Sequence, residues 1–479
     1  MSDAAAEPAT LSRSAQRLAL IVAGAFFMES LDGTVIVTAL PQIGRSFGVT
    51  ATDLSLAVTA YLLTVAALIP ASSWAADRFG SRTVFVGAIG VFTSASALCG
   101  LSDGFWPFVA ARILQGAAAA LMAPVGRLVV LRTTPKSQLV QAIATLTWPA
   151  LIAPVIGPAI GGLITTYSSW RWIFFLNLPL GAVGAVLAWR QVPQHRGEVR
   201  APFDTAGFVL TAAGLASFVY GLDLLSRREA NPPLAAALVG AGVAILAAAL
   251  VHARRAAHPL IDLACLSIRS FVLSTLSSGV LARIAISATP FLLPLMFQLV
   301  FGMSPFRSGL LVLVYMGGNL LMKTVTTPVL RRFGFRTVLV ANGTLNAAAI
   351  LACGLVSPAT PLAAIIPVLF LAGAFRSMNF TAANTLAFAD VPPERRAGAT
   401  ALWGVAQQVA FSLGVAVAAV LLNLGLALRG APRLALVDFR FAFGVLSAVA
   451  FGSALWFLSL PAGAGAEVSG HRRAAPARA

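Results

Sequence analysis

Two carboxylates, Glu29 and Asp32, interrupt a long apolar run near the start of the chain. They are three residues apart, so a helix would present both on one face. Inside a bilayer an ionisable side chain is costly and usually marks a functional site. Burial and mutual repulsion would let the two groups share one proton at neutral pH. We predict that they bind protons; the alternative is that one or both form a permanent ion pair that only joins helices.

Basic residues also fall inside apolar segments, where they are unusual. They are Arg112, Arg283, Lys323 and Arg376. Only Glu29, Asp32 and Asp223, the last near a segment end, stand against them, so the embedded charge is not acid-rich. Lys323 could instead extend its ammonium group to the membrane surface.

The composition requires lipid as the solvent. Of 479 residues, 58% are hydrophobic and 10% are charged, which is far more apolar than a soluble domain. The net charge of +17 comes from short basic clusters between apolar runs, a pattern typical of membrane loops, and we expect no nucleic-acid binding. The three cysteines lack metal-site spacing, and we expect neither a metal nor a cofactor.

Apolar segments long enough to cross a bilayer recur along the whole chain. The side that would hold both termini carries more than twice the Lys and Arg of the other, which predicts cytoplasmic termini. We predict an all-α polytopic membrane protein with fourteen transmembrane helices. They span residues 16–39, 54–76, 83–101, 106–131, 139–165, 172–190, 205–225, 234–252, 271–300, 308–330, 337–356, 361–386, 399–427 and 440–460.

An internal repeat organises these segments. Residues 77–86 and 331–340 match at seven of ten positions, and the same offset of 254 residues aligns Tyr61 with Tyr315. It also places Arg283 opposite Glu29. Two parallel halves of six helices, with a pair inserted between them, would hold a substrate site at the midplane where they meet. The predicted units are residues 1–190, an inserted helix pair with linkers at 191–270, residues 271–460 and a cytoplasmic tail at 461–479.

Polar and basic residues of the second half are the candidates for that cavity. The balance of embedded charge gives neutral and anionic amphipathic substrates the same weight as cationic ones. Most of these residues could equally bond across helices. The candidates are Arg283, Arg376, Asn379 and Gln298.

Four motifs, in order, make the chain resemble the fourteen-helix drug:proton antiporters of the major facilitator superfamily. Residues 31–41 (LDGTVIVTALP) are similar to the signature of that branch, and residues 76–82 (ADRFGSR) to the loop motif of the superfamily. Residues 112–116 (RILQG) resemble an R-x-x-Q-G motif, and residues 157–162 (GPAIGG) resemble the antiporter motif G-P-x-x-G-G. The sequence departs from these patterns where Ser73 and Ala153 replace usual glycines and Ser81 replaces a basic residue.

The resemblance implies roles for the motif residues. Arg112 would face the cavity and modulate the proton affinity of an acidic partner in the first helix, although a structural salt bridge is the competing interpretation. Residues of the loop after the second helix would form a conformational latch, which should be asymmetric because Arg331 replaces the aspartate in the second copy. Residues of the glycine-proline motif would act in gating, although tight packing explains them almost as well. The latch is Asp77, Arg78, Gly80 and Arg82, and the antiporter motif is Gly157, Pro158, Gly161 and Gly162.

Together these patterns predict a proton-coupled secondary transporter of small amphipathic or drug-like compounds, working by alternating access, and the resemblance implies that it is an exporter. The expected setting is the plasma membrane of a bacterium, with a small-molecule substrate, protons and the lipid bilayer as partners and multidrug efflux as the outcome. The alternatives are a proton-coupled symporter or a metabolite exporter of the same fold. The alternative from another class is a membrane-embedded enzyme or sensor. For the enzyme, the sequence lacks a histidine cluster, an acidic metal pair and a glycine-rich phosphate loop.

Overall fold

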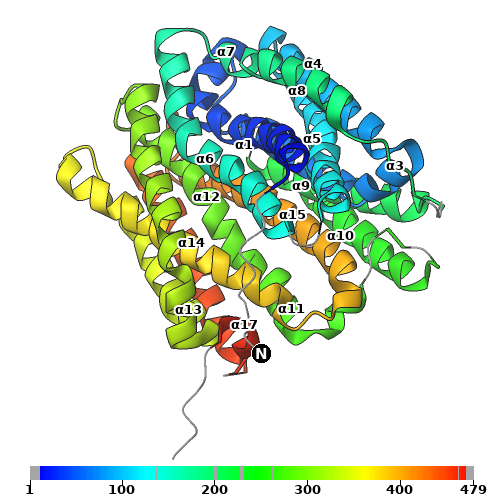
Figure 1. Cartoon of the computed structure of the whole chain (residues 1–479). Helices are drawn as coiled ribbons and strands as arrows, with labels where there is room; N and C mark the ends of the chain where they lie inside the picture. The colour runs from blue at the N-terminus through cyan, green and yellow to red at the C-terminus, as the bar shows by residue number, and fades with distance from the viewer. Residues whose placement is uncertain are drawn as a thin grey trace, which may run out of the picture.

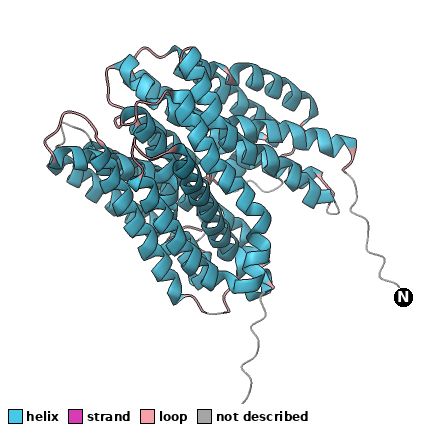
Figure 2. Cartoon of the chain, turned by 90° about the vertical axis from the view of Figure 1, so that its left-hand side faces the viewer, coloured by secondary structure: helices cyan, strands magenta, loops and turns pink. Residues whose placement is uncertain are grey.

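The computed structural model describes residues 11–135, 138–197, 202–226, 231–257, 259–260, 263–461 and 463–470. Helices make up the regular structure of this part of the chain, as Figure 2 shows. The first ten residues and the last nine of the predicted tail lie outside it. The helices up to the inserted pair are α1 (Arg13–Phe47), α2 (Ser55–Leu68), α3 (Ala71–Phe79), α4 (Ser81–Leu101), α5 (Phe105–Thr133), α6 (Leu139–Tyr167), α7 (Trp172–Phe175) and α8 (Asn177–Gln191).

The remaining helices follow the same pattern of long apolar segments and short loops. Figure 1 shows α1, α4, α5 and α8 gathered on one side of the molecule and α12, α13 and α14 on the other. These helices are α9 (Thr205–Ser226), α10 (Pro232–Arg255), α11 (Arg269–Thr275), α12 (Ser278–Leu299), α13 (Pro305–Leu355), α14 (Leu362–Ala389), α15 (Arg396–Leu428), α16 (Leu436–Trp456) and the short α17 (Ala466–Ser469).

Local sequence sets where the helices begin and end. The Ser12 hydroxyl accepts a hydrogen bond from the Ala15 N–H at 3.3 Å and caps α1, and Ser304 caps α13 in the same way ahead of Pro305. Between such ends the backbone bonds to itself, as hydrocarbon requires. Large apolar side chains such as Val243, Val251 and Leu250 on α10 remain exposed because lipid, not water, surrounds them.

Most of the predicted spans correspond to single helices, and the others to a bent pair or to one arm of a broken helix. Twelve are long and apolar enough to cross a membrane, and α2 and α3, bent by 59°, form a further one together. Helix α13 has 51 residues and would be about 76 Å long, more than twice the hydrocarbon thickness. It breaks at Gly334, where φ is 75°, and each of its two arms is long enough for one crossing. Counted in this way, the helices are compatible with fourteen spans.

The sequence repeat extends to the backbone conformation. Gly48 and Gly302 have φ of 68° and 66°, and Gly80 and Gly334 have φ of 96° and 75°. Residues with a side chain rarely adopt such values. Each pair is separated by the same 254 residues as the sequence repeat. Both the first loop and the break in each copy therefore have the same geometry.

Equivalent helices also pack alike in the two copies. Gly116 on α5 lies against the carbonyl of Tyr61 on α2, and Gly373 on α14 lies against the carbonyl of Tyr315 on α13. A side chain at either glycine would collide with that backbone, so only glycine permits these crossings. The two contacts supply a structural alignment of α5 with α14.

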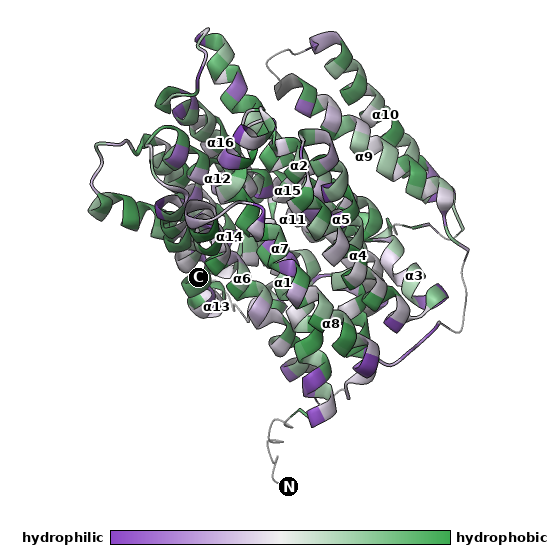
Figure 3. Ribbon diagram, turned by 90° about the horizontal axis from the view of Figure 1, so that it is seen from above, coloured by the Kyte–Doolittle hydropathy of each residue, from purple (hydrophilic) through white to green (hydrophobic). Residues whose placement is uncertain are grey.

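The inserted pair, α9 and α10, packs at the edge of the molecule beside α2 and α15 (Figure 3). Asp204, just before α9, joins three segments of this region. Its carboxylate accepts hydrogen bonds from the Gly207 N–H at 2.9 Å and the Leu260 N–H at 3.2 Å, and it lies 2.7 Å from Nε2 of His252 on α10. Partial burial raises the pKa of Asp204, but these contacts outweigh it and hold the pKa below the ordinary 3.8.

Asp204 should therefore make the stability of the protein depend on pH. A carboxyl with a lowered pKa in the folded state stabilises that state above the pKa of the unfolded chain, and the contribution disappears as pH falls through the folded-state pKa. We expect Asp204→Asn to lower the thermal unfolding midpoint of the purified protein at pH 7, and the gap from wild type to close below about pH 4. Asp103→Asn, whose side chain is 94% exposed, is the control. A gap that stays constant with pH would contradict this assignment.

Candidate functional site

A cavity of about 440 Å³ lies between helices of the first half of the chain and helices of the second half. Its walls come from α1, α2, α5 and α6 of the first half and from α12, α13, α14 and α15 of the second. Most of the surface is apolar, with a few polar groups, as in sites for small organic ligands. The charged residues among its described lining are Arg112, Lys323 and Arg376, all of them basic.

At one wall of this cavity, Arg112 forms a buried ion pair with Asp32. Arg112 Nη1 lies 2.6 Å from Asp32 Oδ2, and both side chains are fully inaccessible to solvent. Gln115 Nε2 donates to Asp32 Oδ1 at 2.9 Å, and Asn177 Nδ2 donates to the same oxygen at 3.1 Å. Every one of these contacts is made to the ionised carboxylate. The pair is a neutral, well-bonded unit that connects α1, α5 and α8.

The remaining face of the Arg112 guanidinium lies over the ring of Tyr61. Its central carbon is 4.3 Å from the ring centroid, within the range of cation–π attraction. Arg112 Nε and Nη2 have no hydrogen-bond acceptor among the described groups. Gly116, one turn further along α5, allows the approach of α2 that brings the ring to this position.

Glu29 has a different environment from Asp32, although both lie on α1. Its side chain is only partly buried, and the described residues offer it no hydrogen bond or ion pair. The charges that act on it are Asp32 on its own helix and, more weakly, the exposed Arg127 on α5. From the sequence, we predict that the two carboxylates act as a pair. In the structure, Asp32 is fully hydrogen-bonded, whereas Glu29 has no bonding partner among the described residues.

The predicted cavity residues of the second half lie in several places. Arg376 lines the cavity. Arg283 is buried elsewhere and donates to the Ser274 carbonyl at 2.9 Å. Asn379 is also buried outside the described cavity lining, with its Oδ1 unbonded. Gln298 crosses between the halves, where its Nε2 donates to the Thr38 carbonyl at 2.9 Å.

Asn177 is the member of the site that the sequence analysis did not single out. It contacts Asp32 across 145 residues of chain. Its signal was present, because it is an amide within an apolar segment, where polar side chains bond between helices. Lys323, which could have reached the membrane surface, instead lines the cavity.

The glycine-proline motif places α6 between α1 and α13. A side chain at Gly161 would lie 2.5 Å from the Val35 carbonyl of α1. On its other side, Gly162 meets the Pro305 carbonyl of α13, and the carbonyl of Pro158 meets Gly309. Gly157 likewise faces Thr34 of α1. The motif therefore brings the two halves into backbone contact through one helix.

This contact lies at the cavity wall, because Pro158, which meets Gly309, is part of the cavity lining. Thr166 Oγ1 accepts a hydrogen bond from the Phe306 N–H at 3.0 Å, just beyond the α6–α13 crossing. Thr52 donates to Asn423 at 3.3 Å in the same region. Thr52 follows the end of α1, and Thr166 lies in the last turn of α6, so both are on the side of the molecule away from the start of α1. The halves are joined on that side.

The predicted latch joins segments within the first half. Asp77 Oδ1 is 3.0 Å from Arg132 Nη2 at the end of α5, and the Asp77 carbonyl accepts the Gly197 N–H at 3.1 Å. Arg82 Nε donates to the Val192 carbonyl at 2.5 Å, beyond α8. Gly80 provides the positive φ of the turn, and Arg78 is exposed.

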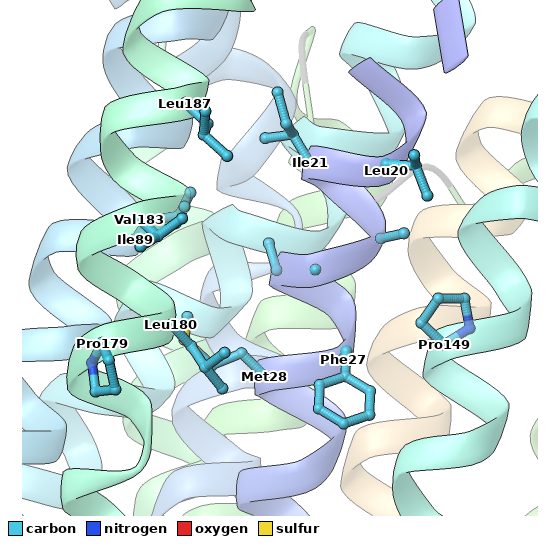
Figure 4. Close-up of a pocket in the computed structure, with 14 residues that line it drawn as sticks. Leu20, Ile21, Phe27, Met28, Ile89, Pro149, Pro179, Leu180, Val183 and Leu187 are labelled. Carbon is cyan, nitrogen blue, oxygen red and sulfur yellow. The ribbon is translucent and has the colours of Figure 1, made fainter. Parts of the chain in front are cut away.

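A second pocket, of about 500 Å³, lies on the surface of α1, α6 and α8. Figure 4 shows Phe27, Met28, Leu180 and Val183 around it. All its lining side chains are apolar, so it lacks the polar groups that orient a ligand. Within the described chain, no group of three or more His, Cys, Asp or Glu side chains could hold a metal ion. The central cavity is the candidate site.

The fold and this cavity define an all-α, multi-pass membrane protein with a cavity between two sets of helices. The model of the Major Facilitator Superfamily matches residues 22–251 and 275–478. The chain belongs to this superfamily.

A putative multidrug resistance protein, MdtD of Klebsiella pneumoniae, is 38% identical over 405 residues, covering 84% of this chain and 85% of that one. Two solved structures share the fold at low sequence identity. An auto-inhibited peptide transporter of the POT family has a TM-score of 0.67 and 18% identity, covering 97% of this chain and 99% of that one. A D-xylose–proton symporter has a TM-score of 0.65 and 13% identity, covering 94% and 98%.

The Asp32–Arg112 pair should be strongly coupled in stability. Removing one partner leaves the other charge buried without compensation, at a cost of roughly 3–5 kcal/mol. We expect Asp32→Asn and Arg112→Met each to destabilise the protein, and the double variant to recover much of the loss. A double-mutant cycle from unfolding in one detergent measures this coupling. Strictly additive losses would show that the pair contributes no mutual stabilisation.

The α6–α13 crossing should depend on Gly162. Valine there would push against the Pro305 backbone, so the halves would separate at this point. In a background without native cysteines, the pair Thr166→Cys and Phe306→Cys should cross-link, and Gly162→Val should reduce the yield several-fold. Gly184→Val is the matched control, because nothing lies within 4 Å of that position. Equal yields in both variants would contradict the proposed contact.

Proposed function

We propose that this protein is a proton-coupled secondary exporter of small amphipathic, drug-like compounds that works by alternating access. The observation that carries the proposal is the cavity between the halves, with a buried ion pair in its wall and an unbonded carboxylate one helical turn away. The relative named as a multidrug resistance protein supports the substrate class. Membership of a transporter family argues against an enzymatic role.

The distribution of basic residues supports a placement in the bacterial plasma membrane with both termini in the cytoplasm. With that orientation, the α6–α13 contacts close the outer side of the cavity. The conformation described is then the one that receives substrate from the cytoplasm. We take residues 1–190 and 271–460 as the two units that rock against each other, with 191–270 as the inserted connection.

Glu29 is the proton carrier that we propose. Asp32 already holds Arg112 and two amide donors, so protonating it would disrupt a buried network. Glu29 has no such partner to lose. The other groups that act on it are Asp32, the exposed Arg127 on α5 and the Tyr61 phenol on α2. These groups act on Glu29 only electrostatically, so no hydrogen bond must break when Glu29 gains or loses a proton.

Coupling would follow from the cost of a charge in a water-poor site. An ionised Glu29 beside Asp32 places two negative charges near one arginine, which favours a conformation where Glu29 meets water. A protonated Glu29 is neutral and tolerates closure. The proton gradient would therefore bias which side of the cavity is open, and the Asp32–Arg112 pair would hold α1 and α5 together throughout the cycle.

Measurement of proton release tests this proposal. Everted vesicles with an acidic interior are given ethidium, chloramphenicol or 2-naphthoate, and external pH is followed with a fluorescent dye. Wild type should release protons from the lumen on addition of a substrate, Glu29→Gln should not, and Glu29→Asp should retain a reduced response. A Glu29→Gln variant with wild-type release would remove Glu29 from this role.

The direction of the proton signal separates the proposal from its alternative within the fold. A symporter would take protons into the lumen together with the substrate, so the external medium would become more alkaline. No response to any of the three compounds, with folded protein present in the vesicles, would argue against drug export.

A further inference from the structure

The two halves differ in the charges that they bring to the cavity. The repeat offset of 254 places Ile286 where the first half has Asp32. The matching contacts of Gly116 and Gly373 place Leu369 where it has Arg112. Ile286 and Leu369 are 1% and 0% exposed. The positions equivalent to the buried ion pair of the first half therefore hold two apolar residues in the second.

The second half instead has an arginine at another level of the same helix. Arg376 is three residues beyond Gly373, and its guanidinium carbon lies 5.8 Å from the ring of Tyr315, the repeat partner of Tyr61. Each half thus places an arginine near the equivalent tyrosine. Arg112 comes before the contact glycine of its helix, whereas Arg376 comes after it. Arg112 has a carboxylate partner. Arg376 has none among the described residues, and its buried Nε has no hydrogen-bond partner.

Lys323 adds a second cation to the same wall. It lines the cavity together with Arg376, and the two lie close enough for their charges to repel. No described ion pair includes Lys323. Between walls that are mostly apolar, two neighbouring cations without a counter-charge repel each other, and an anion between them would relieve that repulsion.

The apolar part of the cavity indicates the rest of the ligand. Phe380 and Phe411 are stacked with ring centroids 6.1 Å apart, and both line the cavity with Phe291 and Met316. Such a surface favours an aromatic or alkyl body. The volume of about 440 Å³ accommodates a small organic molecule.

We propose that the cavity selects amphipathic organic anions, with the anionic group between Lys323 and Arg376 and the apolar body against the phenylalanines. The proposal rests on the proposed function only in taking this cavity as the transport site. It disfavours lipophilic cations, because the cavity has no carboxylate in its described lining. An anionic lipid headgroup offers the same charge as a soluble organic acid, so the test must separate the two.

Binding of three ligands of nearly equal shape tests the charge preference. They are 2-naphthoate, neutral 2-naphthamide and cationic 2-naphthylmethylammonium, titrated calorimetrically into purified protein in zwitterionic lipid nanodiscs. Naphthoate should bind at least tenfold more tightly than the amide, and the ammonium compound least. Equal affinities, or a preference for the cation, would overturn the proposal.

Variants assign the preference to the two cations. Arg376→Gln and Lys323→Gln should each weaken naphthoate binding at least tenfold while leaving amide binding nearly unchanged, and Arg376→Lys should retain most of the affinity. Arg440→Gln, which removes an exposed cation on α16 outside the described cavity lining, is the matched control. Unfolding midpoints and amide binding show whether each variant is folded. Undiminished naphthoate binding in folded Arg376→Gln and Lys323→Gln would refute the assignment.

Two further experiments separate a soluble acid from an anionic lipid, and failure of this inference from failure of the proposed function. Phosphatidylglycerol in the nanodisc should leave naphthoate affinity unchanged if the site accepts a soluble acid; strong competition would identify an anionic lipid as the occupant and overturn the selection of soluble anions. Glu29→Gln should bind naphthoate like wild type but release no protons. Loss of charge preference with intact proton release would refute only this inference, and intact preference without proton release in wild type would refute only the proposed function.

Discussion

Hydrocarbon requires every charged side chain to have a counter-charge, a set of hydrogen-bonding partners or contact with water, and the charges of this chain are arranged by that requirement. The ion pair of Asp32 and Arg112 meets this requirement most completely. It is completely buried, and it gathers an amide from α5 and another from α8 around one carboxylate. It joins α1 to α5 and α8 through buried polar contacts. The other embedded charges satisfy the requirement less completely, and those are the ones available for function.

Much of this arrangement could be predicted from the sequence, because lipid simplifies the pattern. The apolar segments indicated the helices, and the repeat indicated two similar halves. Even the break of α13 at Gly334 corresponds to a loop that the repeat had marked. The charge pattern identified Glu29, Asp32 and Arg112 as candidate functional residues.

The partners of those residues could not be predicted, because they depend on how helices rotate and cross. Arg283 aligns with Glu29 in the repeat, yet it bonds to carbonyls at the break between α11 and α12 and to Asn384. Gln298 bonds to the backbone of α1 rather than lining the described cavity. Both side chains donate to backbone carbonyls of neighbouring segments, and the spacing of residues in the sequence does not predict which carbonyls lie within reach. Asn177 reached Asp32 for the same reason, from a helix far away in the chain.

The imbalance of charge in the cavity has an electrical consequence. Arg112 is neutralised by Asp32, but Lys323 and Arg376 give the described lining of the cavity a net positive charge. A resting membrane potential, negative inside, pulls such a charge toward the cytoplasm with about 2.3 kcal/mol per 100 mV for each charge that crosses the whole field. In the orientation that we propose, the protein without substrate would be drawn back to the cytoplasm-facing state, whereas a bound anion would reduce this force. The voltage itself would then reset the cycle after each release.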